Sequence, residues 1–400
     1  MIRRIILPFF VLLWFCSCNS QKYNENLLVV LSMDGFRWDY PEKVPTPNLD
    51  SIAAYGVKAK RFIPSFPTTT FASHYTMATG LHPDKHGILA NRFYAPDLDA
   101  DFNKGDRTTV EDGKFYGGEP IWVTAEMQNL KTATFYWVGS EADVQGIRPT
   151  YWKQYDHDFP YGQRIDTVMY WLGLPEEMRP RLVMWYFDEP DSSGHRYGPE
   201  SDSVKSVIAR LDSLVGVFLN KMLALPHAEK INFIIVSDHG MAELSPEREI
   251  FLDQHIDTSM IALVDGWNPT MNIKVKDGYL DDVYESMKQI ENMSVWKHGE
   301  VPERLQHGTH IRTHDLILLA DEGYSISWSW RPNRSKATHG FDNALEDMHA
   351  IFYAIGPDFK INYEVHELHT VDLYSLMAYL LKLQPAEGDG NFERISNVIQ

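Results

Sequence analysis

The alternation of hydrophobic and polar positions predicts buried strands separated by amphipathic helices. Three continuous apolar runs are typical of strands buried on both faces of a parallel sheet. They span residues 27–33, 181–187 and 231–237. Further strands are expected at residues 57–62, 132–137 and 349–355. Helical spacing or helix start signals are found at residues 46–55, 71–79, 120–130, 161–172, 204–222 and 371–381. This order predicts an α/β fold with a mostly parallel central sheet flanked by helices.

Each of the three apolar runs is followed by a carboxylate. Asp34 follows the first run, Asp191 lies four residues beyond the second, and Asp238 ends the third together with His239. Each Asp alone could equally shape a turn or cap a helix. In open α/β sheets, however, the residues beyond the carboxyl ends of the strands line the functional crevice. Three such carboxylates therefore indicate one shared site.

Histidines complete a set of possible metal ligands. His195 stands four residues after Asp191, His239 follows Asp238 directly, and His339 lies in the stretch THGFDN. Three carboxylates and three imidazoles are enough for two zinc-like ions if a nucleophile or water completes each shell. Oxygen and nitrogen ligands without sulfur suit zinc, and manganese or iron would also fit.

A turn rich in proline and threonine precedes the helix expected at residues 71–79. Thr68, Thr69 and Thr70 crowd the start of this helix, where backbone amides and the helix dipole favour an anion. A threonine in this place can also be a simple helix cap, and local reasoning does not choose among the three. Asn91 follows shortly afterwards and could donate a hydrogen bond to an oxyanion or close a turn.

Changes in composition suggest how the chain is divided. A domain is expected over residues 27–385, followed by a C-terminal tail at residues 386–400. Residues 93–118 are polar and rich in Gly and Asp, which predicts a surface excursion. About one hundred residues separate His239 from the next cluster of polar residues, so residues 241–338 are expected to form an inserted subdomain.

The N-terminal segment is typical of a secretion signal. Residues 1–17 combine an arginine pair with an apolar stretch that is shorter than the ~20 residues of a membrane span. The only two cysteines, Cys16 and Cys18, lie at its end. This placement resembles a bacterial lipoprotein signal with Cys18 lipidated and residues 18–26 as a tether. An ordinary signal peptide with incidental cysteines is the alternative. Either way the sequence predicts export to the periplasm or cell surface, with a membrane anchor in the first case.

Composition limits the partners of the folded domain. The chain has 400 residues, of which 44% are hydrophobic, so it can bury a large core. Its 37 basic and 55 acidic residues give a formal net charge of -18, which opposes binding to a nucleic-acid scaffold. Small phosphate esters remain suitable substrates, because bound divalent ions supply positive charge locally.

Six motifs give the chain a specific resemblance over roughly residues 27–385. They are MDGFRWDY, PTTTFASHYTMATGLHPDKHGI, EPDSSGHRYGP, SDHGM, THGFDN and AIGPDFK. In this order they resemble the nucleotide pyrophosphatase/phosphodiesterase family of the alkaline phosphatase superfamily. The resemblance implies an alkaline-phosphatase-like three-layer sandwich with a mostly parallel central sheet flanked by helices, plus an inserted subdomain.

The family resemblance also implies roles for individual residues. It puts one zinc ion beside Asp34, Thr70, Asp238 and His239, and a second beside Asp191, His195 and His339. It identifies Thr70 as the nucleophile of a covalent nucleotidyl intermediate. Asn91, with the backbone amide near Phe71, would bind a nonbridging oxygen of the phosphoryl group.

Substrate binding is expected near the nucleophile. Phe71 with Trp152 or Tyr155 could sandwich a nucleobase, although these aromatic residues could also be packing residues. Ala72-Ser73 stands where family members commonly have Pro-Asn, which leaves the nucleophile unchanged and alters its surroundings.

The sequence thus predicts a secreted two-metal phosphodiesterase or nucleotide pyrophosphatase that releases nucleoside 5'-monophosphates. A related bimetal hydrolase of phosphate monoesters, phosphonates or lipid-headgroup phosphodiesters is the alternative enzyme. A lipid-anchored binding protein with a structural bimetal centre is the alternative from another class.

Overall fold

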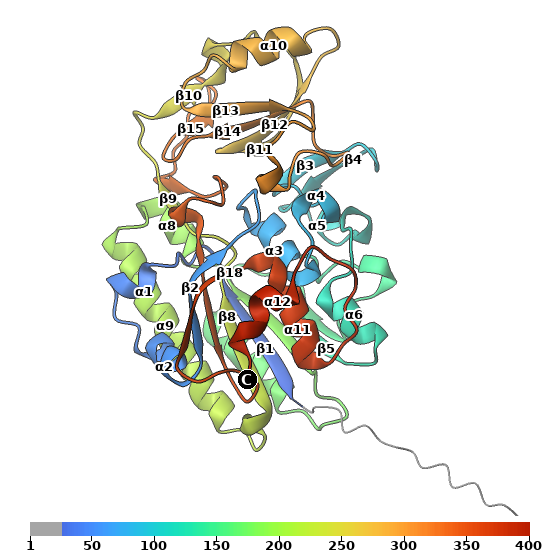
Figure 1. Cartoon of the computed structure of the whole chain (residues 1–400), viewed down its shortest axis with the longest axis vertical. Helices are drawn as coiled ribbons and strands as arrows, with labels where there is room; N and C mark the ends of the chain where they lie inside the picture. Colours follow the sequence, from blue (N-terminus) through green and yellow to red (C-terminus); the bar gives the residue numbers. More distant parts are fainter. Residues whose placement is uncertain (1–25) are drawn as a thin grey trace, which may run out of the picture.

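The computed structural model describes residues 26–400 and contains a sheet domain with a smaller subdomain above it (Figure 1). The expected signal segment at residues 1–17 and the lipidation site at Cys18 lie outside the described residues. Within residues 26–400, no helix is both long and apolar enough to cross a membrane.

An eight-stranded sheet forms the middle layer of the larger domain. Its strand order is β18 (Tyr363–His369), β2 (Val57–Ile63), β17 (Ala350–Ile355), β8 (Ile231–Val236), β1 (Leu27–Met33), β7 (Leu182–Phe187), β5 (Thr132–Phe135) and β6 (Tyr151–Lys153). Only β17 runs antiparallel to its neighbours, β2 and β8, within this sheet of the described chain. The predicted mostly parallel α/β sheet is therefore confirmed.

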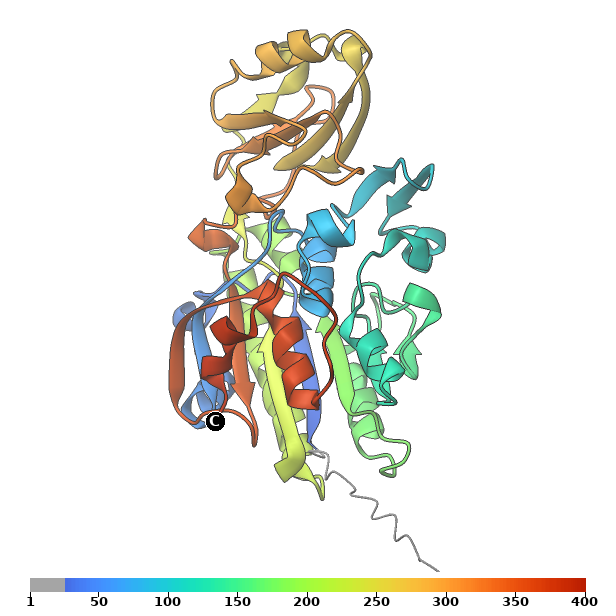
Figure 2. The same ribbon diagram turned by 45° about the vertical axis from the view of Figure 1, so that its right-hand side comes forward.

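Helices cover both faces of this sheet, as the two ribbon views show (Figure 2). One face carries α3 (Thr70–Thr79), α6 (Ile121–Met127), α11 (Leu373–Leu381) and α12 (Phe392–Ile395). The other carries α2 (Pro47–Tyr55), α7 (Tyr161–Leu172) and α9 (Asp202–Leu223). Along β1, Leu28 and Val30 belong to the first core and Val29 and Leu31 to the second. Successive side chains of a strand point to opposite faces, so an unbroken apolar run serves two cores.

The segment expected as an inserted subdomain folds around a third core. Its four-stranded sheet has the order β11 (Ile261–Trp267), β12 (Thr270–Val275), β14 (Leu316–Ala320) and β13 (Met293–Lys297), with α10 (Leu280–Met287) alongside. The chain leaves and re-enters the sheet domain through β9 (Ala242–Glu243) and β16 (Ala337–Thr338), which pair with each other. The two crossings therefore lie side by side at the base of the subdomain.

The polar segment at residues 93–118 is not a mere surface excursion. Phe93, Phe102 and Phe115 are buried in the core that also contains α3. The strands β3 (Arg92–Ala95) and β4 (Ala100–Asn103) form a hairpin, in which Phe93 pairs with Phe102. The aromatic side chains turn inward because their apolar area is large, while the polar residues between them face outward.

The last residues of the chain also differ from their expected form. Ile395 and Val398 within residues 386–400 are fully buried in the core of the sheet domain. Ile399 forms an isolated bridge with Phe359. Apolar residues at the spacing of α12 give this segment a buried face, so it packs on the domain and is not a tail.

Candidate active site

The carboxylates of the site are brought together by the sheet. β1 lies between β7 and β8, and Met33 of β1 is level with Phe187 of β7. Asp34 follows β1 directly, while Asp238 lies two residues beyond the end of β8. Because these parallel strands end at the same edge, residues far apart in sequence converge there.

The turn after β1 requires a close approach of two backbone segments. Gly35 has a φ of 66°, and a Cβ atom placed on it would lie 2.9 Å from the Cα of Asp191. The amide of Asp191 also donates a 3.0 Å hydrogen bond to the carbonyl oxygen of Asp34. Glycine at position 35 therefore allows Asp34 and Asp191 to approach each other.

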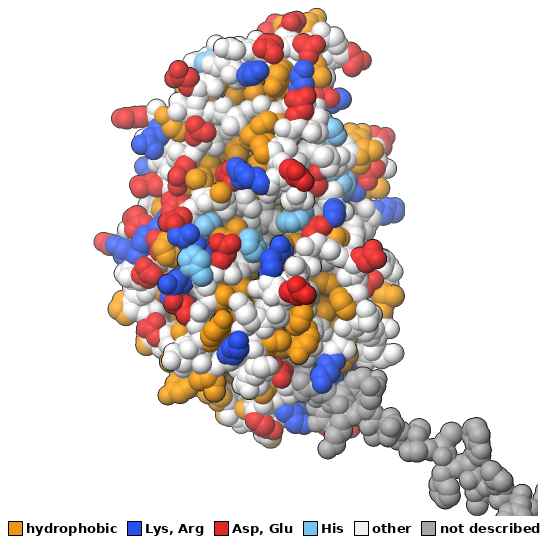
Figure 3. All heavy atoms as spheres, viewed as in Figure 1, with side chains coloured by type: hydrophobic (Ala, Val, Ile, Leu, Met, Phe, Trp, Pro, Cys, Tyr) orange, Lys and Arg blue, Asp and Glu red, His pale blue; other side chains and the backbone are white. Residues whose placement is uncertain are grey.

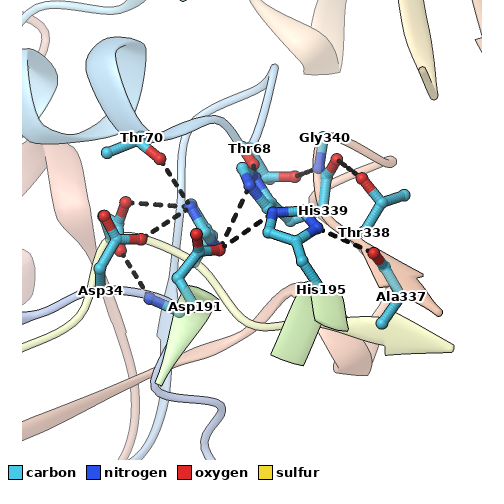
Figure 4. Close-up of polar contacts among 12 residues, drawn as sticks. Asp34, Thr68, Thr70, Asp191, His195, Ala337, Thr338, His339 and Gly340 are labelled. Atoms are coloured by element: carbon cyan, nitrogen blue, oxygen red, sulfur yellow. Dashed lines mark hydrogen bonds and ion pairs between the residues drawn. The ribbon is translucent and has the colours of Figure 1, made fainter. Parts of the chain in front are cut away.

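Two adjoining groups of metal-ligand atoms form at this edge (Figure 4). The first consists of Asp34, Asp238 and His239, and the second of Asp191, His239 and His339; within each group the ligand atoms lie within 4.8 Å of one another. The Nε2 atom of His239 lies 3.0 Å from Asp238 Oδ2 and 3.4 Å from Asp34 Oδ1. His239 thus stands at the junction of the two groups.

His195 joins the second group from the helix α8 (Asp191–Tyr197). Residues four apart share one helix face, and the Nε2 atom of His195 lies 3.3 Å from Asp191 Oδ1. His339 approaches the same carboxylate oxygen from the loop after β16, at 3.5 Å. The Asp191 carboxylate is thereby flanked by two imidazoles.

The histidines are oriented as metal ligands usually are. The three Nδ1 atoms donate hydrogen bonds to backbone carbonyl oxygens: His195 to Ala337 at 2.8 Å, His239 to Gly240 at 2.9 Å and His339 to Thr68 at 2.8 Å. A carbonyl oxygen only accepts hydrogen bonds, so each Nδ1 carries the proton and each Nε2 offers a lone pair to the centre.

The buried carboxylates also have the properties expected of metal ligands. Asp34 Oδ1, Asp191 Oδ1 and Asp238 Oδ2 are buried and have no hydrogen-bond partner within the described residues. Buried oxygen atoms of this kind are costly unless a charge balances them. Three such oxygens facing three imidazole lone pairs fit divalent cations.

Crowding of like groups perturbs the proton affinities of the site. Burial, together with the neighbouring Asp238 and Asp191 carboxylates, raises the pKa of Asp34. Burial, together with the adjacent His239, lowers the pKa of His339 to about 3. His339 is therefore neutral near pH 7, which is the form that binds a metal.

The hydroxyl of Thr70 faces the first ligand group. Thr70 is the first residue of α3, and its Oγ1 lies 3.3 Å from the Nε2 atom of His239. Thr68 uses its hydroxyl to bridge Phe341 and Gly340 in the loop that carries His339. Of the three threonines, Thr70 is the one whose hydroxyl contacts a residue of the ligand groups.

Asn91 lies beside Thr70. Its Oδ1 accepts a 3.2 Å hydrogen bond from the backbone amide of Phe71, so its Nδ2 group remains available as a donor. Ala72 and Ser73, which follow Thr70 on the same helix after Phe71, are fully buried.

His74 was not anticipated from the sequence. It is fully buried, its Nδ1 donates a 2.9 Å hydrogen bond to the carbonyl oxygen of Thr70 and lies 3.2 Å from Asp238 Oδ2, and its Nε2 lies 2.8 Å from the hydroxyl of Ser32. It thus links the start of α3 to β1 and lies next to the Asp238 carboxylate. Its position four residues after Thr70, on the same helix face, is the signal that could have identified it.

Two cavities meet at Thr70, Asp191 and Lys104. One has a volume of about 310 Å³ and is lined by Phe71, Tyr155 and residues of the ligand groups. The other has a volume of about 660 Å³ and extends between the sheet domain and the inserted subdomain. Lys104 lies in the polar segment after β4, where no periodic pattern singles it out.

Two of the three aromatic residues expected to bind substrate line the smaller cavity, and the third does not. Phe71 and Tyr155 line the smaller cavity, where Phe71 packs edge-on against Phe102 and Tyr155 against Tyr136. Trp152 lies outside the lining of both cavities, on β6, with the Arg148 guanidinium 5.6 Å from its ring centroid.

The mostly parallel sheet, with metal-ligand groups at its strand ends, is characteristic of the alkaline-phosphatase-like class of α/β proteins. Residues 28–342 match the family model described as type I phosphodiesterase / nucleotide pyrophosphatase, and the chain belongs to this family.

Several curated proteins are similar to most of the chain. Human ectonucleotide pyrophosphatase/phosphodiesterase family member 5 is 34% identical over 382 residues, which are 95% of this chain and 79% of that protein. Venom phosphodiesterase CdcPDE of Crotalus durissus collilineatus is 33% identical over 389 residues, which are 94% of this chain and 47% of that protein. The chain therefore spans about half the length of this venom enzyme.

The fold has a counterpart among solved structures. Murine ectonucleotide pyrophosphatase/phosphodiesterase 5, as an inactive threonine-to-alanine variant in complex with AMP, superposes with a TM-score of 0.90 at 33% identity. The similarity covers 94% of this chain and 100% of the murine one. The predicted family and fold class are thus confirmed.

Proposed function

We propose that this protein is an exported phosphodiesterase that hydrolyses nucleotide phosphodiester or pyrophosphate bonds and releases nucleoside 5'-monophosphates. The position of the Thr70 hydroxyl, 3.3 Å from His239 in the ligand centre, in the lining of a cavity of about 310 Å³, carries the proposal. The AMP bound to the similar murine protein supports the choice of a nucleotide.

The proposed reaction has two displacements at phosphorus. In the first, Thr70 Oγ forms a bond to phosphorus, its proton passes to water, and the leaving oxygen departs with the bonding electron pair. In the second, water attacks phosphorus and the bond to Thr70 Oγ breaks. Thr70 regains a proton, and the nucleoside 5'-monophosphate is free to leave.

The chain's residues would hold two divalent ions, for which zinc is the proposed identity. Asp34, Asp238 and His239 with Thr70 would hold one, and Asp191, His195 and His339 the other. When bound, such ions supply Lewis-acid charge that favours the ionised form of a nearby hydroxyl and offsets the charge developing on phosphoryl oxygens.

Asn91 and the smaller cavity would orient the substrate. The Nδ2 group of Asn91, held by the hydrogen bond from Phe71 to Oδ1, would donate to a nonbridging oxygen. Phe71 and Tyr155 would contact the base of the retained nucleoside. Both contacts keep phosphorus next to the Thr70 hydroxyl.

A hydrolase of phosphate monoesters is the second candidate, because the ligand centre alone would serve either substrate. To separate the two, cleavage of a nitrophenyl ester of thymidine 5'-monophosphate is compared with cleavage of nitrophenyl phosphate. The diester should be strongly preferred, since only it fills the smaller cavity. Preference for the monoester would refute the proposed function.

The nucleophile is tested with Thr70→Ala, for which Thr70→Ser is the matched control. Removing the hydroxyl should lower kcat by at least about 10³-fold while metal content is retained. The serine variant keeps the attacking oxygen and should retain most of the activity. Unchanged activity in Thr70→Ala would support a binding protein with a structural bimetal centre.

Export and anchoring are proposed from residues 1–26. We expect cleavage before Cys18 and lipidation of this residue, which would tether the domain to a membrane surface. Mass spectrometry of the mature N-terminus tests this directly. An unmodified N-terminus beyond Cys18 would exclude the anchor and leave an ordinary exported protein.

A further inference from the structure

The larger of the two cavities lies on the side of Thr70 that faces the inserted subdomain. Thr70, His195 and His339 line it, so it opens onto the second ligand group. The smaller cavity instead contacts Asp34 of the first group. In a displacement at phosphorus the leaving group departs on the side opposite the nucleophile. If the retained nucleoside lies in the smaller cavity, the larger cavity is where the leaving group lies.

Three tryptophans of the subdomain gather at this larger cavity; Trp267, Trp328 and Trp330 are here called the aromatic platform. The rings of Trp328 and Trp330 are stacked, with centroids 5.3 Å apart and planes 16° apart. Trp267 is 51% exposed and Trp330 is 65% exposed, which is unusual for such large side chains. Trp328 is partly buried and packs against the core of the subdomain. Exposed tryptophans such as the other two, lining one cavity, are typical of a binding surface for a planar ring.

Positive charge lies between the platform and the ligand centre. Lys104, Arg92 and Arg331 line the larger cavity, and none of them forms an ion pair with a carboxylate of residues 26–400. The Arg331 guanidinium lies 4.3 Å from the ring centroid of Trp267. In a chain of formal net charge -18, three unpaired cations in one cavity favour an anionic ligand there.

A buried amide adds an independent observation. Asn272 of β12 lines the same cavity and is only 4% exposed, and its Oδ1 has no hydrogen-bond partner among the described residues. A buried oxygen of this kind lacks a donor that a ligand could provide. A base or ribose hydroxyl offers such a donor, whereas a bare phosphate chain does not.

The platform is held at a fixed place relative to the ligand centre. The hydroxyl of Thr270, at the start of β12, donates a 2.6 Å hydrogen bond to the carbonyl oxygen of Gly340. Gly340 follows His339 directly. Because Trp267 pairs with Thr270 across the β11–β12 hairpin, this bond links the platform to a ligand-bearing loop.

We propose that the aromatic platform is a subsite for the leaving group and selects substrates whose leaving phosphate chain carries a second nucleoside. The base would stack on the platform, and the phosphates would lie along Lys104, Arg92 and Arg331. This inference rests on the proposed function. It adds that the subdomain, through its tryptophans, determines which pyrophosphate bonds are preferred.

The test compares two substrates that both release AMP. Diadenosine triphosphate leaves ADP, which contains a base, whereas ATP leaves pyrophosphate, which does not. Trp330→Ala should raise KM for diadenosine triphosphate by about 10-fold, the size of effect expected when a stacked base loses its aromatic partner, and leave KM for ATP unchanged. Trp330→Phe, which keeps an aromatic face, should restore most of the loss. Tyr170→Ala, which removes an exposed aromatic residue from α7, is the matched control.

The outcomes separate this inference from the function on which it rests. If the wild-type protein releases AMP from neither substrate, the proposed function fails. If AMP is released from both and Trp330→Ala changes neither KM, or changes both equally, only the platform is refuted. ADP-glucose distinguishes a base from a sugar: an equally large loss with it would overturn the assignment of the platform to a nucleoside.

Discussion

The ligand centre and the walls of the two cavities are built in different ways. The ligands stand at or just beyond the ends of strands, or on the short helix α8, and backbone carbonyls hold their histidines in place. The cavity walls come from the hairpin at β3–β4, from the segment around Tyr155 and from the inserted subdomain. The centre is built on the ends of the central strands, whereas the walls come from connecting segments and the subdomain, which vary more readily than sheet strands do.

The largest effect should come from the ligand centre itself. Asp238→Ala removes a buried carboxylate that approaches both His239 and His74. We expect loss of about one bound ion per chain and a fall in activity beyond the roughly 10–100-fold typical of changes to residues that only support a ligand. Metal analysis and kinetics on the same preparation measure both. Asp202→Asn, whose side chain is exposed on α9, should leave both values unchanged.

A smaller effect should follow from a change in the wall of the smaller cavity. Tyr155→Ala should weaken AMP binding by about 10-fold through loss of contact with the base, while metal content stays the same. Trp152→Ala should alter AMP affinity little, because that ring lies outside the cavity. Calorimetric titration with AMP distinguishes them. Equal losses of AMP affinity in the two variants would show that Trp152 also contacts the base.

The smallest effect concerns the stability of the folded protein and comes from a buried histidine. His86 is fully buried: its Nδ1 accepts a hydrogen bond from Ile88, its Nε2 donates to Thr76, and its ring packs edge-on against Tyr75. Burial, aided by His82, lowers the pKa of His86 to about 3.

The direction of the pH effect follows from this shift. Between pH 6.5 and about 3 the unfolded chain binds a proton at His86 that the folded protein does not. The contribution of His86 to stability is therefore complete above its ordinary pKa and is lost as pH falls, by up to about 1.4 kcal/mol per pH unit. Unfolding temperatures at pH 7, 6 and 5 should decline less steeply in His86→Gln than in the wild type. Parallel declines would contradict the buried neutral state.

The same contrast explains what could be predicted from sequence. Asp34, Asp238 and His239 are recognisable because a buried strand and the polar residue after it are adjacent in the chain. Asp191 and His195 are recognisable from their spacing of four residues. His339 carries no such local signal, and the order of motifs shared with the family identified it.

The walls were harder to foresee, because their residues meet only through tertiary structure. Phe93 and Phe102 lie in a segment with a polar average composition, which concealed the inward-facing hairpin. Trp267 and Trp330 are separated by about sixty residues and converge only because β11 and the loop after β15 (Ser325–Ser327) border the same cavity. The role of Lys104 is equally invisible to periodicity.

The paired crossings at the base of the subdomain have a mechanical consequence. Ala337 and Thr338 of β16 pair with β9, and the carbonyl of Ala337 also accepts the hydrogen bond that orients His195. His339 is the next residue along the chain. A displacement of the β9–β16 pair would therefore move the hydrogen-bond acceptor of His195 and the backbone of His339 together. The strands that join the subdomain to the sheet domain thus also position two of the histidines, so a substitution that disrupts the pairing of β16 with β9 should perturb both imidazoles at once.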